Sequence, residues 1–168
     1  MRAVRDWARH ERDRPAPYRY AARIYEDMGS LSLAEEAAAR ETEIAPGDAA
    51  AWERLGRLRL RRFDRVGARQ ALERAQALAP SLVGLLDLAL VSHLIGDVGA
   101  EVSACEAATR IAPDSPEAWS RCAHALARTD RTRDCLAACE RALELGEDPE
   151  VVALREQVLA QAPKELAA

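Results

Sequence analysis

The apolar residues of this chain recur with the spacing of one face of an α-helix. Two such stripes follow one another in residues 49–82, first Trp52, Leu55 and Gly56, and then Ala68, Leu72, Ala75 and Leu78. Apolar positions three and four residues apart lie on the same side of a helix, so each stripe predicts a short amphipathic helix. A tight turn is expected between them near Phe63 and Asp64, and Pro80 ends the pair.

The helix pair recurs along the chain with a period of 34 residues. Tyr18 precedes Trp52 by this distance, and Pro46 precedes Pro80 by the same distance. Pro80 and Pro113 are 33 residues apart, so we place the loss of one residue in the loop directly after Pro80. A recurrence of this length is the sequence signature of a repeat protein. A compact helical bundle is the alternative fold, but a bundle does not require the recurrence.

Seven positions of the second unit together resemble a tetratricopeptide repeat (TPR), which folds as helix–turn–helix. They are Trp52, Leu55, Gly56, Ala68, Leu72, Ala75 and Pro80. The resemblance implies an all-α, right-handed α–α superhelix (solenoid) of four helix pairs with a C-terminal capping helix. The expected order is an N-terminal helical extension or partial repeat at 1–14, repeats at 15–48, 49–81, 82–115 (one residue short) and 116–148, a capping helix at 149–162 and a frayed tail at 163–168.

Two glutamates depart from the TPR pattern. Glu41 and Glu101 both fall in second helices, at positions where the family has a small residue. Each glutamate therefore weakens the match of its own second helix, although the repeat itself remains recognisable.

Candidate N-cap residues support the expected helix starts. A short polar side chain before a helix accepts a hydrogen bond from the backbone N–H groups of its first turn. Four residues stand at such positions before a first helix or the capping helix: Asp48, Ser81, Ser115 and Asp148. The capping helix is expected to turn four apolar residues toward the last repeat: Val151, Leu154, Val158 and Leu159.

The composition agrees with an all-α protein and limits the classes of function. Apolar residues make up 49% of the chain and aromatic residues only 4%, so alanine and leucine carry the core. The net charge is −4 with both signs interspersed, which argues against a general nucleic-acid surface. The N-terminus lacks the apolar segment of a secretory signal, and the apolar run 82–95 is too short to span a bilayer. These features predict a cytoplasmic protein.

The resemblance to TPR domains implies a concave groove lined mainly by the first helix of each pair. It assigns to this groove Arg19, Arg23, Glu26, Glu53, Arg57, Arg61, Leu86, Leu90, His93, Ser120, His124 and Arg128. Arginine binds carboxylates bidentately, and a desolvated leucine supplies binding energy. We therefore expect a partner protein whose extended or helical segment carries acidic groups and an apolar anchor.

The same residues are also compatible with two different roles. The arginines could belong to a solvated face with internal ion pairs, as Glu53 and Arg57 are four residues apart. Leu86, Leu90 and Leu94 could instead contact a second copy of the chain, which would make the protein a self-associating structural subunit. The carboxylate clamp of chaperone-binding TPR domains is not expected, because the chain contains no asparagine and has leucines at two clamp positions.

The cysteines are the remaining candidates for chemistry. Cys105, Cys122, Cys135 and Cys139 could form a metal or redox site, yet all four coincide with TPR core positions. A buried free cysteine behaves as a small apolar residue, so we expect core cysteines rather than a thiol or metal sensor. Motifs for catalysis or phosphate binding are not found, and the three histidines are scattered. We expect no enzyme activity, no cofactor and no metal.

Overall fold

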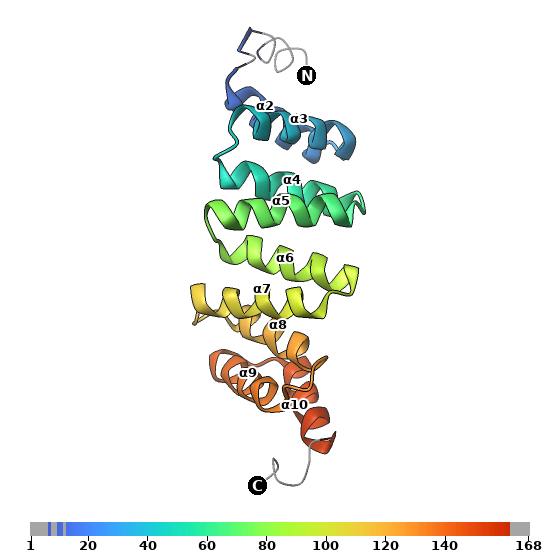
Figure 1. Ribbon diagram of the computed structural model, residues 1–168, viewed down its shortest axis with the longest axis vertical. Coiled ribbons are helices and arrows are strands. Elements are labelled where there is room, and N and C mark those ends of the chain that lie inside the picture. Colours follow the sequence, from blue (N-terminus) through green and yellow to red (C-terminus); the bar gives the residue numbers. More distant parts are fainter. Residues whose placement is uncertain (1–6, 8–9, 12, 162–168) are drawn as a thin grey trace. The chain divides into compact units, whose positions relative to one another are not determined.

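The computed structural model describes residues 7, 10–11 and 13–161, and within them it contains nine helices and no strands (Figure 1). The chain divides into two compact units, Met1–Pro80 and Ser81–Ala168, called here the N-terminal unit and the C-terminal unit. The all-α prediction is confirmed. None of the helices among these residues is long and apolar enough to cross a membrane.

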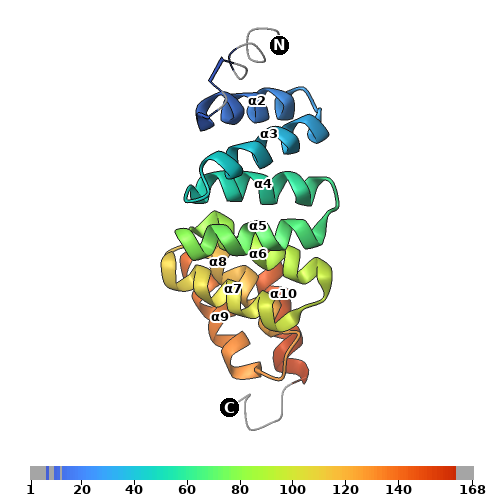
Figure 2. The same ribbon diagram turned by 45° about the horizontal axis from the view of Figure 1, so that its top comes forward.

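The N-terminal unit contains two antiparallel helix pairs, which Figure 2 shows stacked on each other. The first pair is α2 (Pro15–Asp27) with α3 (Leu31–Ile44), and the second is α4 (Ala49–Arg61) with α5 (Arg65–Leu78). Alanines predominate in the interior, for example Ala22, Ala34 and Ala38, which are fully buried beside Leu55 and Leu58. Small side chains allow close approach of the helices, as the alanine-rich and leucine-rich stripes predicted.

Gly56 marks the closest approach between α4 and α5. A Cβ atom at this position would lie 2.6 Å from Cγ of Leu72, a fully buried residue of α5. Carbon atoms in contact normally lie about 3.5 to 4.0 Å apart, so α5 can approach this closely only because residue 56 lacks a side chain.

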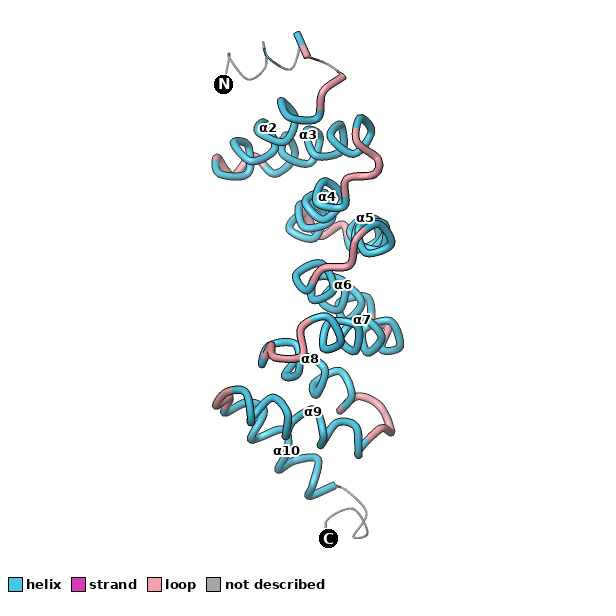
Figure 3. The backbone as a smooth tube through the Cα atoms, turned by 90° about the vertical axis from the view of Figure 1, so that its left-hand side faces the viewer, coloured by secondary structure: helices cyan, strands magenta, loops and turns pink. Residues whose placement is uncertain are grey.

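The C-terminal unit contains two helix pairs and one further helix. The pairs are α6 (Leu82–Ile95) with α7 (Val98–Ile111) and α8 (Pro116–Leu126) with α9 (Thr132–Leu145), and α10 (Pro149–Gln161) packs on α9 and α8. Figure 3 shows the short loops that join successive helices. The core includes Val102, Leu126 and all four cysteines, with Val151 of α10 fully buried against it. The prediction of core cysteines is confirmed.

All four predicted N-caps form hydrogen bonds to backbone N–H groups. Asp48 accepts from Ala50, Ser81 from Gly84, Ser115 from Ala118, and Asp148 from Glu150 and Val151. The helices therefore begin where the sequence indicates, because the cap satisfies donors that have no partner within the helix.

A tryptophan anchors the loop before one first helix in each unit. Trp52 Nε1 donates to the carbonyl oxygen of Pro46 at 3.0 Å, and Trp119 Nε1 donates to that of Pro113 at 2.8 Å. The two pairs have the same spacing of six residues. Equivalent sequence landmarks thus form equivalent contacts in the two units.

Three of the four turns inside the helix pairs contain a residue with a left-handed backbone. Gly29 and Gly96 occupy this conformation with φ of 72° and 87°, and Phe63 occupies it with φ of 63°. Glycine adopts positive φ without steric cost, whereas a side chain there is strained. Phe63 is also 84% exposed, so no packing of its ring offsets the strain.

The predicted N-terminal extension at 1–14 and the tail at 163–168 fall largely or wholly outside the described residues. The predicted inner face of the capping helix is correct in part. Val151, Leu154 and Val158 contact the core, whereas Leu159 is 36% exposed.

Candidate functional site

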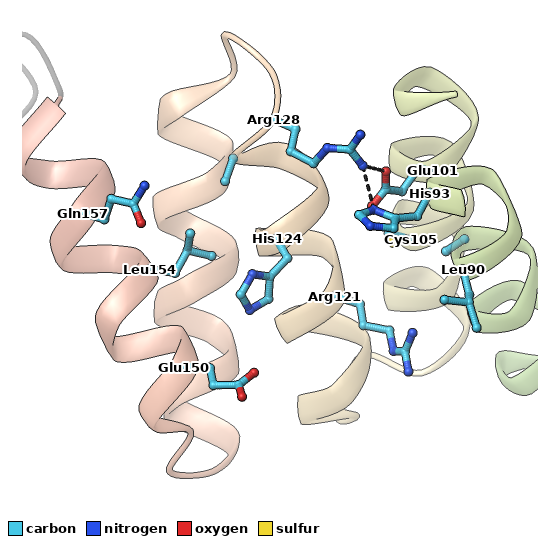
Figure 4. A pocket seen from close by; sticks show the side chains of 12 residues that line it. Leu90, His93, Glu101, Cys105, Arg121, His124, Arg128, Glu150, Leu154 and Gln157 are labelled. Carbon is cyan, nitrogen blue, oxygen red and sulfur yellow. Dashed lines mark hydrogen bonds and ion pairs between the residues drawn. The ribbon is translucent and has the colours of Figure 1, made fainter. Parts of the chain in front are cut away.

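The main candidate site is a cavity of about 580 Å³ in the C-terminal unit, shown in Figure 4. Three helices supply most of its wall: α6 with Leu90 and His93, α8 with Arg121 and His124, and α10 with Glu150, Leu154 and Gln157. Arg128 joins them from the turn that follows α8. Residues of α7, Glu101 and Cys105, complete the lining.

Helical spacing explains why these side chains converge. On α8, residues 121 and 124 are three positions apart, and on α10, residues 150, 154 and 157 are four and three positions apart. Side chains at these intervals project from one face of a helix, so each helix turns these residues toward the cavity. Arg128 reaches the cavity from the turn after α8. The imidazole of His124 lies on the side of α8 that faces Leu154 of α10 (Figure 4).

A buried carboxylate forms one end of the cavity. Glu101 is only 7% exposed, and its Oε2 accepts a hydrogen bond from the Arg128 guanidinium. His93 Nδ1 lies 3.0 Å from Glu101 Oε1 and 2.7 Å from Arg128 NH1. Nδ1 therefore lies within hydrogen-bonding distance of both groups, and it can accept from Arg128 only without a proton and donate to Glu101 only with one.

A second hollow of about 550 Å³ adjoins the first and shares Arg121, His124 and Glu150 with it. The loop between α9 and α10 borders it through Gly146, Glu147 and Asp148. Ser120 Oγ donates to the Asp148 carboxylate at 3.1 Å. The two hollows form one candidate binding surface on the first-helix side of this unit.

Four predicted groove residues lie around the cavity of the C-terminal unit: Leu90, His93, His124 and Arg128. Leu90 is 38% exposed and is therefore available for contact. Leu86 requires a correction, because it is only 8% exposed and belongs to a core cluster with Ala108 and Ala118. Since α6 is apolar nearly all round, sequence spacing alone did not distinguish its core face from its accessible face.

The five predicted residues of the N-terminal unit lie on its first helices: Arg19 and Arg23 on α2, and Glu53, Arg57 and Arg61 on α4. Several of them have partners within the chain. Arg61 pairs with the Glu26 carboxylate, and Glu53 accepts a hydrogen bond from Gln76 at 3.3 Å. Arg23 and Arg57 are exposed.

Arg19 belongs to an ion-pair network around Glu41. Its Nε lies 2.7 Å from Glu41 Oε1, its NH2 lies 2.7 Å from Asp48 Oδ2, and Arg54 Nε lies 3.2 Å from Glu41 Oε2. The hydrogen bond to Glu41 is the main cause of a raised pKa of Arg19, and the charges of Glu41 and Asp48 add to it. Glu41, which departs from the TPR pattern in α3, is fully buried and paired on both oxygens.

Sequence reasoning placed neither Glu41 nor Glu101 in a site. The available signal was a charged residue at a position where the TPR pattern has a small one. A carboxylate at such a buried position requires cationic partners, so the departure itself could have directed attention to nearby arginines.

The four cysteines are free thiols buried in the core. Burial is the main cause of a raised pKa at each, to about 12 for Cys105 and Cys139 and to about 11 for Cys122. Thiolates are therefore scarce at neutral pH. Within the described part of the chain, no group of three or more histidine, cysteine or acidic residues is arranged to hold a metal ion.

Comparison with solved structures defines the class of fold. No family profile matches the sequence, and no curated protein matches it either. The structure nevertheless has a TPR-type fold, as predicted from the repeat, because it matches solved TPR structures along nearly its whole length.

Three of these structures illustrate the likeness. YrrB, described as a TPR protein with an unusual peptide-binding site, matches with a TM-score of 0.82 at 15% identity, over 95% of this chain and 83% of YrrB. MamA matches with a TM-score of 0.79 at 21% identity, over 86% of this chain and 85% of MamA. PilW, a type IV pilus biogenesis factor, matches with a TM-score of 0.69 at 14% identity, over 94% of this chain and 80% of PilW.

Proposed function

We propose that this chain is a non-enzymatic protein-binding module that holds a segment of another protein on the first-helix side of its C-terminal unit. The observation that carries the proposal is the cavity between α6, α8 and α10, where a partly exposed Leu90 lies among polar side chains. A concave surface with an apolar contact and a few convergent polar groups is typical of a binding site. YrrB, which shares the fold, is described as having a peptide-binding site, and this supports the same class of activity here.

A second proposed contact surface lies on the first helices of the N-terminal unit, with Arg19, Arg23, Glu53, Arg57 and Arg61. An acidic partner segment was expected from these arginines. Arg19 and Arg61 already pair with carboxylates of the chain, so an acidic segment would have to displace Glu41 or Glu26. The exposed Arg23 is the better supported contact for such a group.

A cytoplasmic location is part of the proposal. It rests on the four free cysteines, because unpaired thiols are typical of a reducing compartment.

Site-directed photocrosslinking tests this function. A photoreactive amino acid in place of Leu90 should form a specific covalent product with the partner in cells that produce the protein. The matched control is the same amino acid in place of Val83, which lies on the same helix, is 51% exposed and does not line the cavity. Equal labelling from both positions, or none from Leu90, would contradict the proposal.

A self-associating structural subunit is the second candidate. It is favoured by the exposure of two leucines on α6, Leu90 at 38% and Leu94 at 39%. Light scattering separates the two functions, because self-association predicts a mass that rises with concentration and falls on Leu90→Asp substitution.

A thiol sensor is less well supported, since the thiols are buried and their pKa values are raised.

A further inference from the structure

The charges around the cavity and the adjoining hollow are not balanced. Only two arginines line them, Arg121 and Arg128. Five acidic residues line the same surface: Glu101, Glu117, Glu147, Asp148 and Glu150. A cleft with an excess of one sign attracts groups of the opposite sign.

Both arginines already have carboxylate partners inside the unit. Arg128 donates to Glu101, and Arg121 pairs with Glu117 at 3.2 Å. An acidic ligand would compete with these carboxylates for the guanidinium groups and would lie close to Glu150. The guanidinium groups therefore do not make this cavity a site for acidic segments.

Two of these five acidic residues remain available to pair with a ligand. Glu147 and Glu150 are exposed, and within the described part of the chain their side chains make neither an ion pair nor a hydrogen bond. They lie in the α9–α10 loop and the first turn of α10, both on the shared hollow. Asp148 differs from them, because it caps α10 and accepts from Ser120.

An apolar contact lies within the same cavity. Leu90 projects from α6, and Leu154 lies on α10 four residues, about one turn, after Glu150 (Figure 4). A partner side chain that contacts Leu154 would therefore bring its neighbours close to Glu150, while Leu90 offers a second apolar contact across α8 (Figure 4).

We infer that this cavity binds a partner segment in which an apolar side chain stands next to lysine or arginine. The inference rests on the proposed function and specifies its ligand. The apolar side chain contacts Leu154, the basic side chain pairs with Glu150 or Glu147, and the segment extends across α8 to Leu90 (Figure 4). The arginines of the sequence predicted an acidic partner segment, whereas the ligand inferred for this cavity is basic.

Selection from a random peptide library tests the inference without knowledge of the natural partner. The full chain is immobilised, short random peptides are selected on it, and the net charge of the enriched sequences is compared with that of the starting library. The same selection is run on Glu147→Gln/Glu150→Gln. The matched control, Glu140→Gln/Glu156→Gln, removes two exposed carboxylates of α9 and α10 that do not line the cavity.

The expected result is enrichment of peptides that combine leucine-like and basic residues. Fluorescence anisotropy should show that Glu147→Gln/Glu150→Gln weakens the best of these peptides about fivefold, because neither carboxylate remains to pair with the basic side chain. The control variant should bind it as the unsubstituted protein does. Leu90→Ala should weaken it too, which places the peptide in the cavity.

Three outcomes would overturn the inference, and they distinguish a wrong ligand from a wrong function. Enrichment of acidic peptides that depend on Leu90 would refute the basic ligand and leave the protein-binding function intact. The same holds for basic peptides whose affinity is unchanged in Glu147→Gln/Glu150→Gln. Absence of any enrichment would count against the proposed function of the cavity as well as its ligand.

Discussion

Each unit of the molecule buries a glutamate in a second helix, and the two glutamates have different surroundings. Glu41 in the N-terminal unit is held by two guanidinium groups, from Arg19 on α2 and Arg54 on α4. Glu101 in the C-terminal unit is held by one guanidinium group and lies beside an imidazole, which comes from His93.

The ion pairs of Glu41 stabilise the packing of helices, whereas the ion pair of Glu101 borders the candidate site. Glu41 is fully buried and joins α3 to the first helices of both pairs, so it stabilises their packing. Glu101 lies at the wall of the cavity and occupies Arg128 there. An arginine on the first-helix side of a repeat is therefore no evidence for an acidic ligand until its internal partners are known.

The largest expected difference between the two units is a loss of stability of the C-terminal unit at alkaline pH. All four cysteines belong to the C-terminal unit, and burial raises their pKa values, to about 12 for Cys105 and Cys139. A thiol in the unfolded chain ionises near its ordinary pKa, whereas the same thiol in the folded protein stays protonated. The stability that the protein has below the ordinary pKa is therefore lost as the pH rises from that pKa toward the raised pKa of the folded protein. One pH unit above the ordinary pKa, each thiol that stays protonated in the folded protein should lower the free energy of unfolding by about 1 kcal/mol.

Thiolate absorbance during urea unfolding at several pH values measures this effect. The folded protein should show little thiolate up to about pH 10, one to two pH units above the ordinary thiol pKa. Cys105→Ala/Cys139→Ala should roughly halve the pH dependence. Early thiolate absorbance without urea would mean that the thiols are more accessible than the structure indicates.

The two buried glutamates should differ in their contribution to stability. Glu41→Gln removes the charge between two guanidinium groups at a fully buried position and should lower the free energy of unfolding by about 2 kcal/mol. Glu101→Gln should lower it by only about 1 kcal/mol, because Glu101 pairs with one guanidinium group and not with two. Urea denaturation measures both values.

Glu36→Gln is the matched control for these variants, since Glu36 is exposed on the same helix as Glu41. Its effect should stay within about 0.5 kcal/mol. Equal effects of Glu41→Gln and Glu101→Gln would remove the distinction between the two glutamates.

The tryptophan anchors should contribute similar amounts to the stability of the two units. Trp52→Phe and Trp119→Phe each lose one hydrogen bond to a proline carbonyl, and each should lower the free energy of unfolding by about 1 kcal/mol. Chemical denaturation followed by circular dichroism avoids reliance on the substituted fluorophores. A large effect at one position and none at the other would show that the equivalent bonds differ in strength.

The smallest expected effects concern the left-handed turns. Phe63→Gly should raise the free energy of unfolding by about 0.5 to 1 kcal/mol, because glycine relieves the strain at positive φ. Gly96→Ala, at the equivalent turn of the C-terminal unit, should lower it by about 1 kcal/mol. Thermal unfolding detects both changes, and a loss of stability in Phe63→Gly would indicate that the exposed ring makes a stabilising contact.

Local features of the sequence predicted much of this molecule correctly. The helical stripes and the N-caps at Asp48, Ser81, Ser115 and Asp148 follow from spacing and side-chain type, and the core cysteines follow from the resemblance to TPR core positions. The residue lost after Pro80 also coincides with the boundary between Met1–Pro80 and Ser81–Ala168. These features depend on residues close in sequence, whose relation a helix or turn determines directly.

Ion-pair partners and the core face of α6 were decided only by the tertiary structure. Arg19 reaches Glu41 across 22 positions and Arg128 reaches Glu101 across 27, and nothing in the local sequence specifies these pairs. Leu86 and Leu90 likewise lie on one apolar helix, and only the packing of α7 and α8 buries the first and leaves the second partly exposed. A charge or an apolar side chain acquires its role from what packs against it, and the helix pairs must assemble before those neighbours exist.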